Sequence, residues 1–487
     1  MNLLHSLQLT AAEELISVAG LVLLLVAAWS GDRASRAISI ATVGVLVAAA
    51  AIALPALCGS LAGADVSAFG GQYKADAFSA FAKLLIYVGA AVTLIVAPAF
   101  FDRFRAMRAE FPILVLFAAL GMGIMVSAGD LLTLYIGLEL NSLAAYVLAA
   151  FLRTDDRSAE AGLKYFVLGS LASGILLYGI SLTYGFSGTT SFDAIRVAYA
   201  HGMSIGATFG MVLILVGLGF KISAAPFHMW TPDVYEGAPT PVTTFFATAP
   251  KVAALGLLMR ISLEAFGAQP DAWRQVIVAA SLLSIVVGAL GAIGQSNIKR
   301  LMAYSSINNV GFMLIGLAAG TKAGASAMLV YLAIYVAMSV AGFVAILMLR
   351  DADGNQVETI ADLGGLSRTR PGLAAALAMV MFSLAGIPPL FGFWGKFVVF
   401  QAAVQANLLA LASIGIAASV IGAFYYLKVV KVLYFDEPTD KVQGNSDLAH
   451  SILLVVFSVV LSPLGYLLTG WLNTLASSAA SALFHVV

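Results

Sequence analysis

Apolar residues run through this chain in long uninterrupted stretches, and short segments between them carry most of the charge. A stretch of about 18 or more apolar residues crosses a bilayer core about 30 Å thick as a helix, because each residue adds about 1.5 Å. The pattern predicts fourteen such helices, at 13–30, 35–58, 78–100, 111–128, 130–152, 160–186, 205–226, 240–266, 273–295, 298–319, 323–349, 372–404, 407–434 and 449–471. We therefore expect an all-α polytopic membrane protein that forms a single transmembrane domain over residues 1–487.

The composition agrees with lipid as the main solvent. Hydrophobic residues make up 61% of the chain and charged residues 10%, against about 25% charged residues in soluble domains. The net charge is zero, so no global field attracts nucleic acid. The single Cys58 and the five dispersed histidines argue against a metal or cluster, and no GxGxxG or P-loop motif offers a nucleotide site. Asp233 and Glu236 lie among turn-forming Pro and Gly, and we expect them to shape a loop. We predict no cofactor in this chain.

The charges between the helices predict the orientation. The first dozen residues hold no Lys or Arg and precede Glu13 and Glu14, unlike a cleavable signal peptide, so we expect the first helix to be retained. Loops after odd-numbered helices carry fifteen basic residues, whereas loops after even-numbered helices carry five: Lys74, Arg196, Arg260, Arg274 and Lys322. Because basic loops stay in the cytoplasm, we predict that both termini are periplasmic.

The other five basic residues all lie inside predicted helices, and they are Lys83, Lys164, Lys221, Lys251 and Lys396. Glu139 lies near the middle of the fifth helix. A charged side chain at the bilayer centre costs about 2.5–3.5 kcal/mol on insertion scales. These six residues therefore need a partner or a function, and they are the candidate site.

Proline interrupts two helices in similar surroundings, the seventh in GLGFKISAAPFHMWTP and the twelfth in LAGIPPLFGFWGKF. Broken helices at membrane depth line protein or wet cavities, and matching breaks in two halves point to a transport site. Five helices separate the two breaks. We therefore expect helices 1–3 over 13–100, two pseudo-repeated five-helix units, helices 4–8 over 111–266 and helices 9–13 over 273–434, and then helix 14 over 449–471.

Buried lysines suit proton storage. Burial disfavours the ammonium form, so a lysine in the membrane can release and regain a proton near pH 7. A nearby carboxylate favours the ammonium, and we predict that Glu139 pairs with Lys221, five residues before Pro226. Lys251 lies about 16 Å into helix 8, near the midplane. His228, just past the break, titrates near neutrality and is a candidate link between a lysine and water.

Each of these residues also has a purely structural interpretation. Lys83 can extend to the periplasmic interface. Lys164 can form a surface pair with Glu160, four residues earlier in the same helix. His228 can cap a loop or pack against it. The charges on helices 5, 7, 8 and 12 can form a static ion-pair scaffold.

A resemblance to a known family lies in four stretches: DLLTLYIGLELNSLAAYVLAAF, KISAAPFHMWTPDVYEGAPTPVTTFFATAPKVA, NIKRLMAYSSINNVGFMLIG and LAGIPPLFGFWGKF. They look like the antiporter-like, proton-conducting membrane subunits of complex I, the respiratory NADH:quinone oxidoreductase, a family also related to subunits of multisubunit cation/proton antiporters. The resemblance runs from about residue 10 to about residue 470. The string VYEGAPTPVTTFFATAPKVAAL is closer to the N branch of this family than to its M and L branches.

The resemblance implies a proton path with four main positions, Glu139, Lys221, Lys251 and Lys396. It also implies two relay positions, Lys164 and His228. It implies that electron transfer in partner subunits drives the protons, and that those partners hold NADH, FMN, iron–sulfur clusters and quinone. The three additional N-terminal helices favour a bacterial inner membrane.

Two other functions are compatible with the residues alone. The chain could be a component of a multisubunit Na+/H+ antiporter, or a scaffold that binds neighbouring subunits. The scaffold explains the number of helices but not six ionisable residues inside them. Co-purification with flavin and iron–sulfur subunits would separate the pump from the antiporter.

Overall fold

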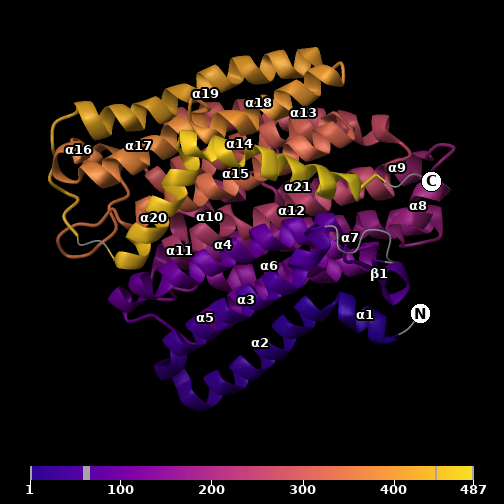
Figure 1. The fold of residues 1–487 in the computed structure, drawn as a ribbon, viewed down its shortest axis with the longest axis horizontal. Helices are drawn as coiled ribbons and strands as arrows, with labels where there is room; N and C mark the ends of the chain where they lie inside the picture. Colours follow the sequence, from indigo (N-terminus) through magenta and orange to yellow (C-terminus); the bar gives the residue numbers. More distant parts are fainter. Residues whose placement is uncertain (1–2, 59–65, 445–446, 485–487) are drawn as a thin grey trace.

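The computed structural model describes residues 3–58, 66–444 and 447–484, and they fold almost entirely as helices that run roughly side by side (Figure 1). Within these ranges ten helical runs are long and apolar enough to cross a membrane. One of these runs, Ala11–Leu57, corresponds to the first two predicted spans, and a bent pair near the C-terminus brings the number to eleven. The expected all-α membrane fold is confirmed. About fourteen helices is compatible with this result, because two more predicted spans are interrupted into shorter helices.

The N-terminal part comprises α1 (Leu3–Leu9), α2 (Ala11–Ser30), α3 (Ser35–Leu57) and α4 (Ala77–Phe101). A small antiparallel hairpin, β1 (Ser67–Ala68) and β2 (Tyr73–Lys74), precedes α4. Asp76 caps α4, because its carboxylate accepts a hydrogen bond from Ser79 N at 2.8 Å. In Figure 1, α1 and α2 lie at one edge of the molecule and α19 (Leu409–Phe435) lies at the opposite edge, while α4 lies farther inside and contacts α12 (Ala249–Arg260) and α15 (Lys322–Leu347).

The middle of the chain forms α5 (Glu110–Ser127), α6 (Leu131–Ala149), α7 (Asp156–Ser187), the short α8 (Phe192–Ala198), α9 (Ile205–Lys221), α10 (Trp230–Gly237), α11 (Thr240–Ala247), α12 (Ala249–Arg260) and the π-helix η4 (Ile261–Ala265). The next part forms α13 (Pro270–Ile293), α14 (Ile298–Ala318), α15 (Lys322–Leu347), α16 (Leu366–Thr369), α17 (Pro371–Ala385), α18 (Phe391–Gln405) and α19 (Leu409–Phe435). The chain ends with α20 (Leu448–Leu461) and α21 (Thr469–Ser481), which cross the molecule against α15.

Both predicted breaks are present. Helix 7 is interrupted between α9 and α10, where the Ala225–Pro226 peptide is cis, and helix 12 is interrupted between α17 and α18, where the Pro388–Pro389 peptide is cis. Gly386 sits in the second break with φ +82°, and a Cβ there would come within 2.8 Å of the Lys396 side chain. Glycine is therefore required both by the backbone and by the approach of the lysine.

Two predicted helices differ from the structure. Helix 8 was expected to be continuous over 240–266, but α11 ends at Ala247 and α12 starts at Ala249. The reason is Pro250, which cannot donate to the helix ladder and whose ring clashes with the carbonyl four residues earlier. Helix 14 was expected over 449–471, but it bends by 68° after α20 and continues to Ser481. Pro463 lies at this bend.

The lipid-facing and interior helices differ clearly in burial. Most of α11, α12, α14 and α15 is buried, whereas less than half of the apolar windows of α2, α3, α7, α13 and α19 is buried. The outer helices carry large apolar side chains on the surface, including Leu25, Leu171 and Phe424. Helices that are apolar all round therefore form the centre of the bundle, and they surround the candidate polar residues.

Candidate proton path

Lys221 is the last residue of α9, directly before the first break. Its ammonium donates to Ser142 Oγ at 2.7 Å and to Tyr146 OH at 3.4 Å, both on α6. Glu139 lies on α6 one turn before Ser142, and one of its carboxylate oxygens is buried without a hydrogen-bond partner. In the described part of the chain Glu139 forms no ion pair with Lys221 within 4.0 Å, so the expected direct pair is absent and Ser142 holds the lysine instead.

Lys251 lies in α12 and is 1% exposed. Its ammonium donates to the Ile222 carbonyl at 2.8 Å and to Ser223 Oγ at 2.6 Å. Those two residues directly follow Lys221 in the break, so the break connects two lysines that are 30 positions apart in the sequence. Ser223 has φ +63°, an uncommon conformation for a residue other than glycine. The aromatic rings of Trp230 and Tyr235 lie 6.0 Å from the same ammonium.

Lys396 repeats this arrangement at the second break. It lies in α18, is 6% exposed, and donates to the Ala385 carbonyl at 2.9 Å and to Ser419 Oγ at 3.0 Å. Ala385 is the last residue of α17. Lys251 and Lys396 thus each donate to a backbone carbonyl at a helix break and to a serine hydroxyl. Among the described residues neither ammonium has a carboxylate within 4.0 Å, so no adjacent negative charge opposes the loss of its proton.

The interior helices α14 and α15 carry several hydrogen-bonded polar side chains. Tyr335 OH donates to Ser306 Oγ at 2.7 Å, and Tyr331 OH donates to Asn309 Oδ1 at 2.6 Å. Ser305 shares a hydrogen bond of 2.5 Å with Tyr426 of α19. The ring of Phe312, three residues after Asn309, lies 4.6 Å from the Lys396 ammonium. Hydroxyl and amide side chains of α14 therefore lie in the interior of the bundle, and the same helix carries the ring that contacts Lys396.

The two predicted relays lie away from this line. Lys164 is 39% exposed and forms ion pairs of 2.7 Å with both Glu160 and Asp233. The expected surface pair with Glu160 is confirmed, and Asp233 adds a second carboxylate from α10. His228 lies half-buried in the break before α10, with Nδ1 buried and lacking a partner among the described residues. His228 is thus close in sequence to the break, but it makes no contact of its own with the three lysines.

A charged network surrounds Lys164 at one end of the bundle. Arg300 of α14 pairs with Asp233 at 2.6 Å and with Glu236 at 2.9 Å, both on α10. The expectation that these two acids shape a loop is wrong, because both lie in the helix α10, and their ion pairs join α7, α10 and α14. No group of three or more His, Cys, Asp or Glu side chains suited to a metal occurs in the described ranges.

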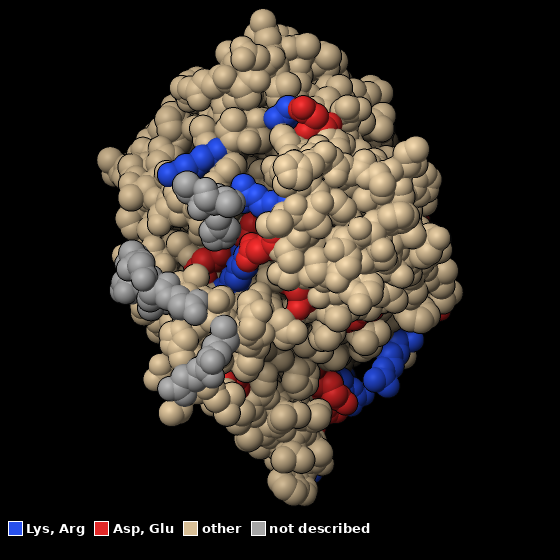
Figure 2. Space-filling model, turned by 90° about the vertical axis from the view of Figure 1, so that its right-hand side faces the viewer, with Lys and Arg blue, Asp and Glu red and all other residues tan. Residues whose placement is uncertain are grey.

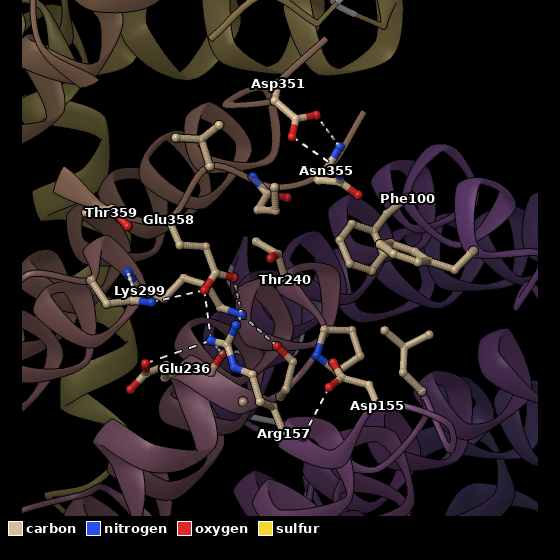
Figure 3. Close-up of a pocket in the computed structure, with 18 of the residues that line it drawn as sticks. Phe100, Asp155, Arg157, Glu236, Thr240, Lys299, Asp351, Asn355, Glu358 and Thr359 are labelled. Atoms are coloured by element: carbon tan, nitrogen blue, oxygen red, sulfur yellow. Dashed lines mark hydrogen bonds and ion pairs between the residues drawn. The ribbon is translucent and has the colours of Figure 1, made fainter. Parts of the chain in front are cut away.

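Beside this network an open cavity of about 840 Å³ is lined by Arg157, Lys299, Glu236 and Glu358 (Figure 3). Glu358 pairs with Arg157 at 2.8 Å and with Lys299 at 3.4 Å. Burial raises the pKa of Glu358, but Lys299 and Arg157 together more than offset this effect and leave the pKa below its usual value. The cavity gives water access to the polar end of α14, which carries Lys299 in its first turn.

A second charged network lies at the opposite end, where α8 and the β-hairpin are found and where the described chain begins and ends (Figure 1). Arg260 of α12 is fully buried and bonds both Asp76 oxygens at 2.8 and 2.9 Å and Glu264 at 2.6 Å. Lys74 pairs with Glu264 at 3.0 Å and with Asp193 at 3.2 Å. On this face charged side chains of both signs gather in a central hollow of a mostly uncharged surface (Figure 2). Lys74 and Arg260, expected in loops, are thus largely interior.

Comparisons with known proteins agree with this geometry. Residues 128–422 match the family described as NADH:quinone oxidoreductase/Mrp antiporter, transmembrane. NADH-quinone oxidoreductase subunit N of Erythrobacter litoralis is 65% identical over 99% of both chains. This chain belongs to the NADH:quinone oxidoreductase/Mrp antiporter family. A chain of respiratory complex I from Thermus thermophilus with bound aureothin is 35% identical, covers 96% of this chain and 99% of its own length, and superposes with a TM-score of 0.80. A chain of the Mrp complex from Dietzia is 23% identical with a TM-score of 0.84 over 98% of both chains, which shows the shared fold.

Sequence reasoning about this antiporter-family chain found the lysines but missed most of their partners. Ser142, Ser223 and Ser419 are single hydroxyl residues in apolar helices or at a break, and nothing in the sequence separates them from other serines. The string YSSINN in α14 offered a stronger signal, because four of its six residues are small polar groups in a predicted span. The Arg260 network joins α4 to α12 across 184 positions, and one sequence gives no information on such a pairing.

Proposed function

We propose that this chain moves protons across the membrane through Glu139, Lys221, Lys251 and Lys396, and that electron transfer from NADH to quinone in partner subunits drives this movement. The observation that carries the proposal is the contact of Lys251 with Ile222 and Ser223, because it joins the central lysine to the end of the helix that carries Lys221. A change in the break therefore acts on both lysines. The name of the E. litoralis relative supports a place in NADH:quinone oxidoreductase.

The relay roles of Lys164 and His228 belong to the same proposal. Lys164 lies at the end of the bundle where charges and the cavity give access to water. His228 follows the break, with a ring nitrogen available to accept or donate a proton. Both residues are suited to carry protons between water and the central lysines, without contacting them in this conformation.

The redox cofactors are proposed to lie in partner subunits. The chain has one cysteine and no nucleotide-binding motif, so NADH, FMN, iron–sulfur clusters and quinone need other chains. Purification under mild conditions should yield the chain together with flavin and iron–sulfur proteins. A flavin-free assembly that exchanges Na+ for H+ would instead favour the antiporter alternative, for which the shared Mrp fold is the supporting observation.

We also propose a bacterial inner-membrane location with both termini periplasmic, and a division into helices 1–3, two five-helix units and helix 14. The excess of basic residues in one set of loops supports the orientation. The two helix breaks, each at an X–Pro peptide and five predicted helices apart, support the pseudo-repeat.

The proposal is tested by Lys221→Met in the assembled complex. Methionine has a similar length and cannot hold a proton, so proton uptake into inverted vesicles per NADH oxidised should fall. Lys322→Met is the matched control, because Lys322 is exposed at the start of α15. If Lys221→Met pumps at the ratio of the control, with equal amounts of assembled complex, the proposed path is wrong.

A further inference from the structure

A buried ion pair lies in the N-terminal helices, away from the four residues of the proposed path. Lys83 of α4 is 4% exposed and its ammonium is 2.6 Å from Glu13 of α2. Lys83 was expected to extend to the membrane interface, and this expectation is wrong because its ammonium turns toward an acid inside the bundle. Taking two such charges out of water costs several kcal/mol for each ion, so the pair needs either strong compensation or a function.

Tyr73 of β2 bridges the two charges. The Lys83 ammonium donates to the Tyr73 hydroxyl at 2.6 Å, and the same hydroxyl donates to Glu13 Oε2 at 2.6 Å. This order of donors gives a complete route for a proton. Lys83 passes one proton to the Tyr73 oxygen while Tyr73 passes its own to Glu13, which converts ammonium and carboxylate into amine and carboxylic acid with no net change of charge.

The surroundings of the pair are suited to water. A cavity of about 240 Å³ adjoins Lys83, and this volume has room for several water molecules. Its polar lining is His5 and Gln8 of α1 with Ser79 and Lys83 of α4, and apolar residues such as Leu9 and Ile52 line the rest. The hydroxyl of Tyr87 is buried and has no hydrogen-bond partner among the described residues. Tyr87 OH and Glu13 lie on the same side of Gly123. A buried hydroxyl of this kind normally bonds a water molecule.

The pair also lies on a helix that contacts the central path. Gly89 of α4, about 9 Å along the helix from Lys83, packs against Thr248, where a Cβ on the glycine would meet Thr248 Oγ1 at 2.7 Å. Thr248 is the break between α11 and α12, three residues before Lys251. At its N-terminal end α4 is held to α12, because Arg260 donates two hydrogen bonds to Asp76, the residue that caps α4.

From these contacts we propose that Glu13, Tyr73 and Lys83 form a further proton-binding site, which exchanges protons with water through the cavity lined by His5 and Gln8. After the transfer through Tyr73, the Lys83 amine, which lines the cavity, takes up one proton from water, so that Lys83 is again an ammonium and Glu13 is a carboxylic acid. The site releases that proton when Glu13 ionises again. The other titratable groups around it are Tyr87, His5 and Asp76, and Asp76 is paired with Arg260. This site rests on the proposed function, because it adds a proton-binding position to the same subunit.

The test removes both charges together. A single change leaves one buried charge unpaired and destabilises the chain, whereas replacing both partners by neutral groups of similar volume is often neutral for stability. We therefore use the double variant Glu13→Gln with Lys83→Met in the full assembled complex. Its control is Glu14→Gln with Lys322→Met, which makes the same two charge changes at a partly exposed acid and an exposed lysine.

Proton uptake per NADH oxidised is measured in inverted vesicles for both double variants, after assembly is compared on native gels. The proton site predicts a lower ratio for Glu13→Gln with Lys83→Met than for the control. An equal ratio in fully assembled complexes would mean that the pair only holds α2 against α4, and it would overturn the inference. If the double variant does not assemble, Tyr73→Phe keeps both charges and removes the bridging hydroxyl, and the same two outcomes apply.

Lys251→Ala is measured in parallel to separate the two proposals. If Lys251→Ala loses pumping and the double variant does not, the further site is wrong and the proposed function stands. If Lys251→Ala also pumps at the wild-type ratio, the proposed function itself fails.

Discussion

The contact between Ser223 and Lys251 allows a sharp prediction about the pH dependence of pumping. Ser223 has φ +63°, so Ser223→Gly removes the hydroxyl at a backbone position that glycine adopts without strain. Lys251 then keeps its bond to the Ile222 carbonyl and loses the bond of 2.6 Å to Ser223 Oγ. A hydrogen bond to a charged group contributes about 1.5–3 kcal/mol, and its loss favours the neutral amine by about tenfold to a hundredfold.

The assay is proton uptake into inverted vesicles per NADH oxidised, measured over a range of pH. Because Lys251 must bind its proton for part of the cycle, the pH at which half of the uptake is lost should fall by about one to two units. Ser284→Ala is the matched control, because Ser284 Oγ accepts a hydrogen bond from Ala225 N in the same break and does not contact the lysine. If Ser223→Gly and Ser284→Ala give the same profile as the wild type, the contact does not control the proton on Lys251.

Three more predictions follow from other contacts. Glu139→Gln should reduce pumping, and its combination with Lys221→Met should lose little more than either change alone, whereas strictly additive losses would show that the two residues act independently. A reporter fused to the C-terminus should be active on the periplasmic side, and activity only in the cytoplasm would refute the orientation. Because Lys299 and Arg157 hold the pKa of Glu358 below 4.5, its carboxylate stabilises the fold above that pH, and this stabilisation is lost as the pH falls through the lowered pKa. Glu358→Gln leaves the buried Lys299 without its carboxylate partner, which should cost about 3–5 kcal/mol of the free energy of unfolding at pH 7. The melting temperature of the purified complex should therefore fall at pH 7 and should fall less at acid pH. An equal fall at both pH values would contradict the pairing.

The positions of the helices could be predicted because lipid imposes a long apolar run on every span. The lysines at 221, 251 and 396 stand out against that background, and both prolines at the breaks are visible in the sequence. Pro250 is also present in the sequence, but its neighbours are apolar, and the pattern therefore predicts one continuous helix over 240–266. The π-helix that follows α12 also depends on tertiary contacts, since Arg260, directly before it, bonds Asp76, which caps α4, and the Val126 carbonyl of α5.

The partners of each lysine could not be predicted from depth alone. Glu139 and Lys221 were both expected near the midplane, but depth does not determine the direction of a side chain around its helix axis. In the structure Lys221 turns to Ser142, and the Glu139 carboxylate lies one turn away. The same limit applies to Glu13 and Lys83, which are 70 positions apart in the sequence and meet only because α2 and α4 both pack against α5.

The central claim is that Lys251 gives up and regains a proton, and Lys251→Arg tests it most directly. Arginine stays charged in proteins, so it keeps the positive charge beside Ile222 and Ser223 but cannot cycle. Its larger side chain can cost about 1–3 kcal/mol in a packed core, and the uptake is therefore normalised to assembled complex on a native gel. We predict that Lys251→Arg assembles and takes up fewer protons per NADH than the wild type, and that Lys251→His, whose imidazole titrates, retains more uptake than Lys251→Ala. Uptake by Lys251→Arg at the wild-type ratio would show that Lys251 is a fixed charge and would contradict the proposed path.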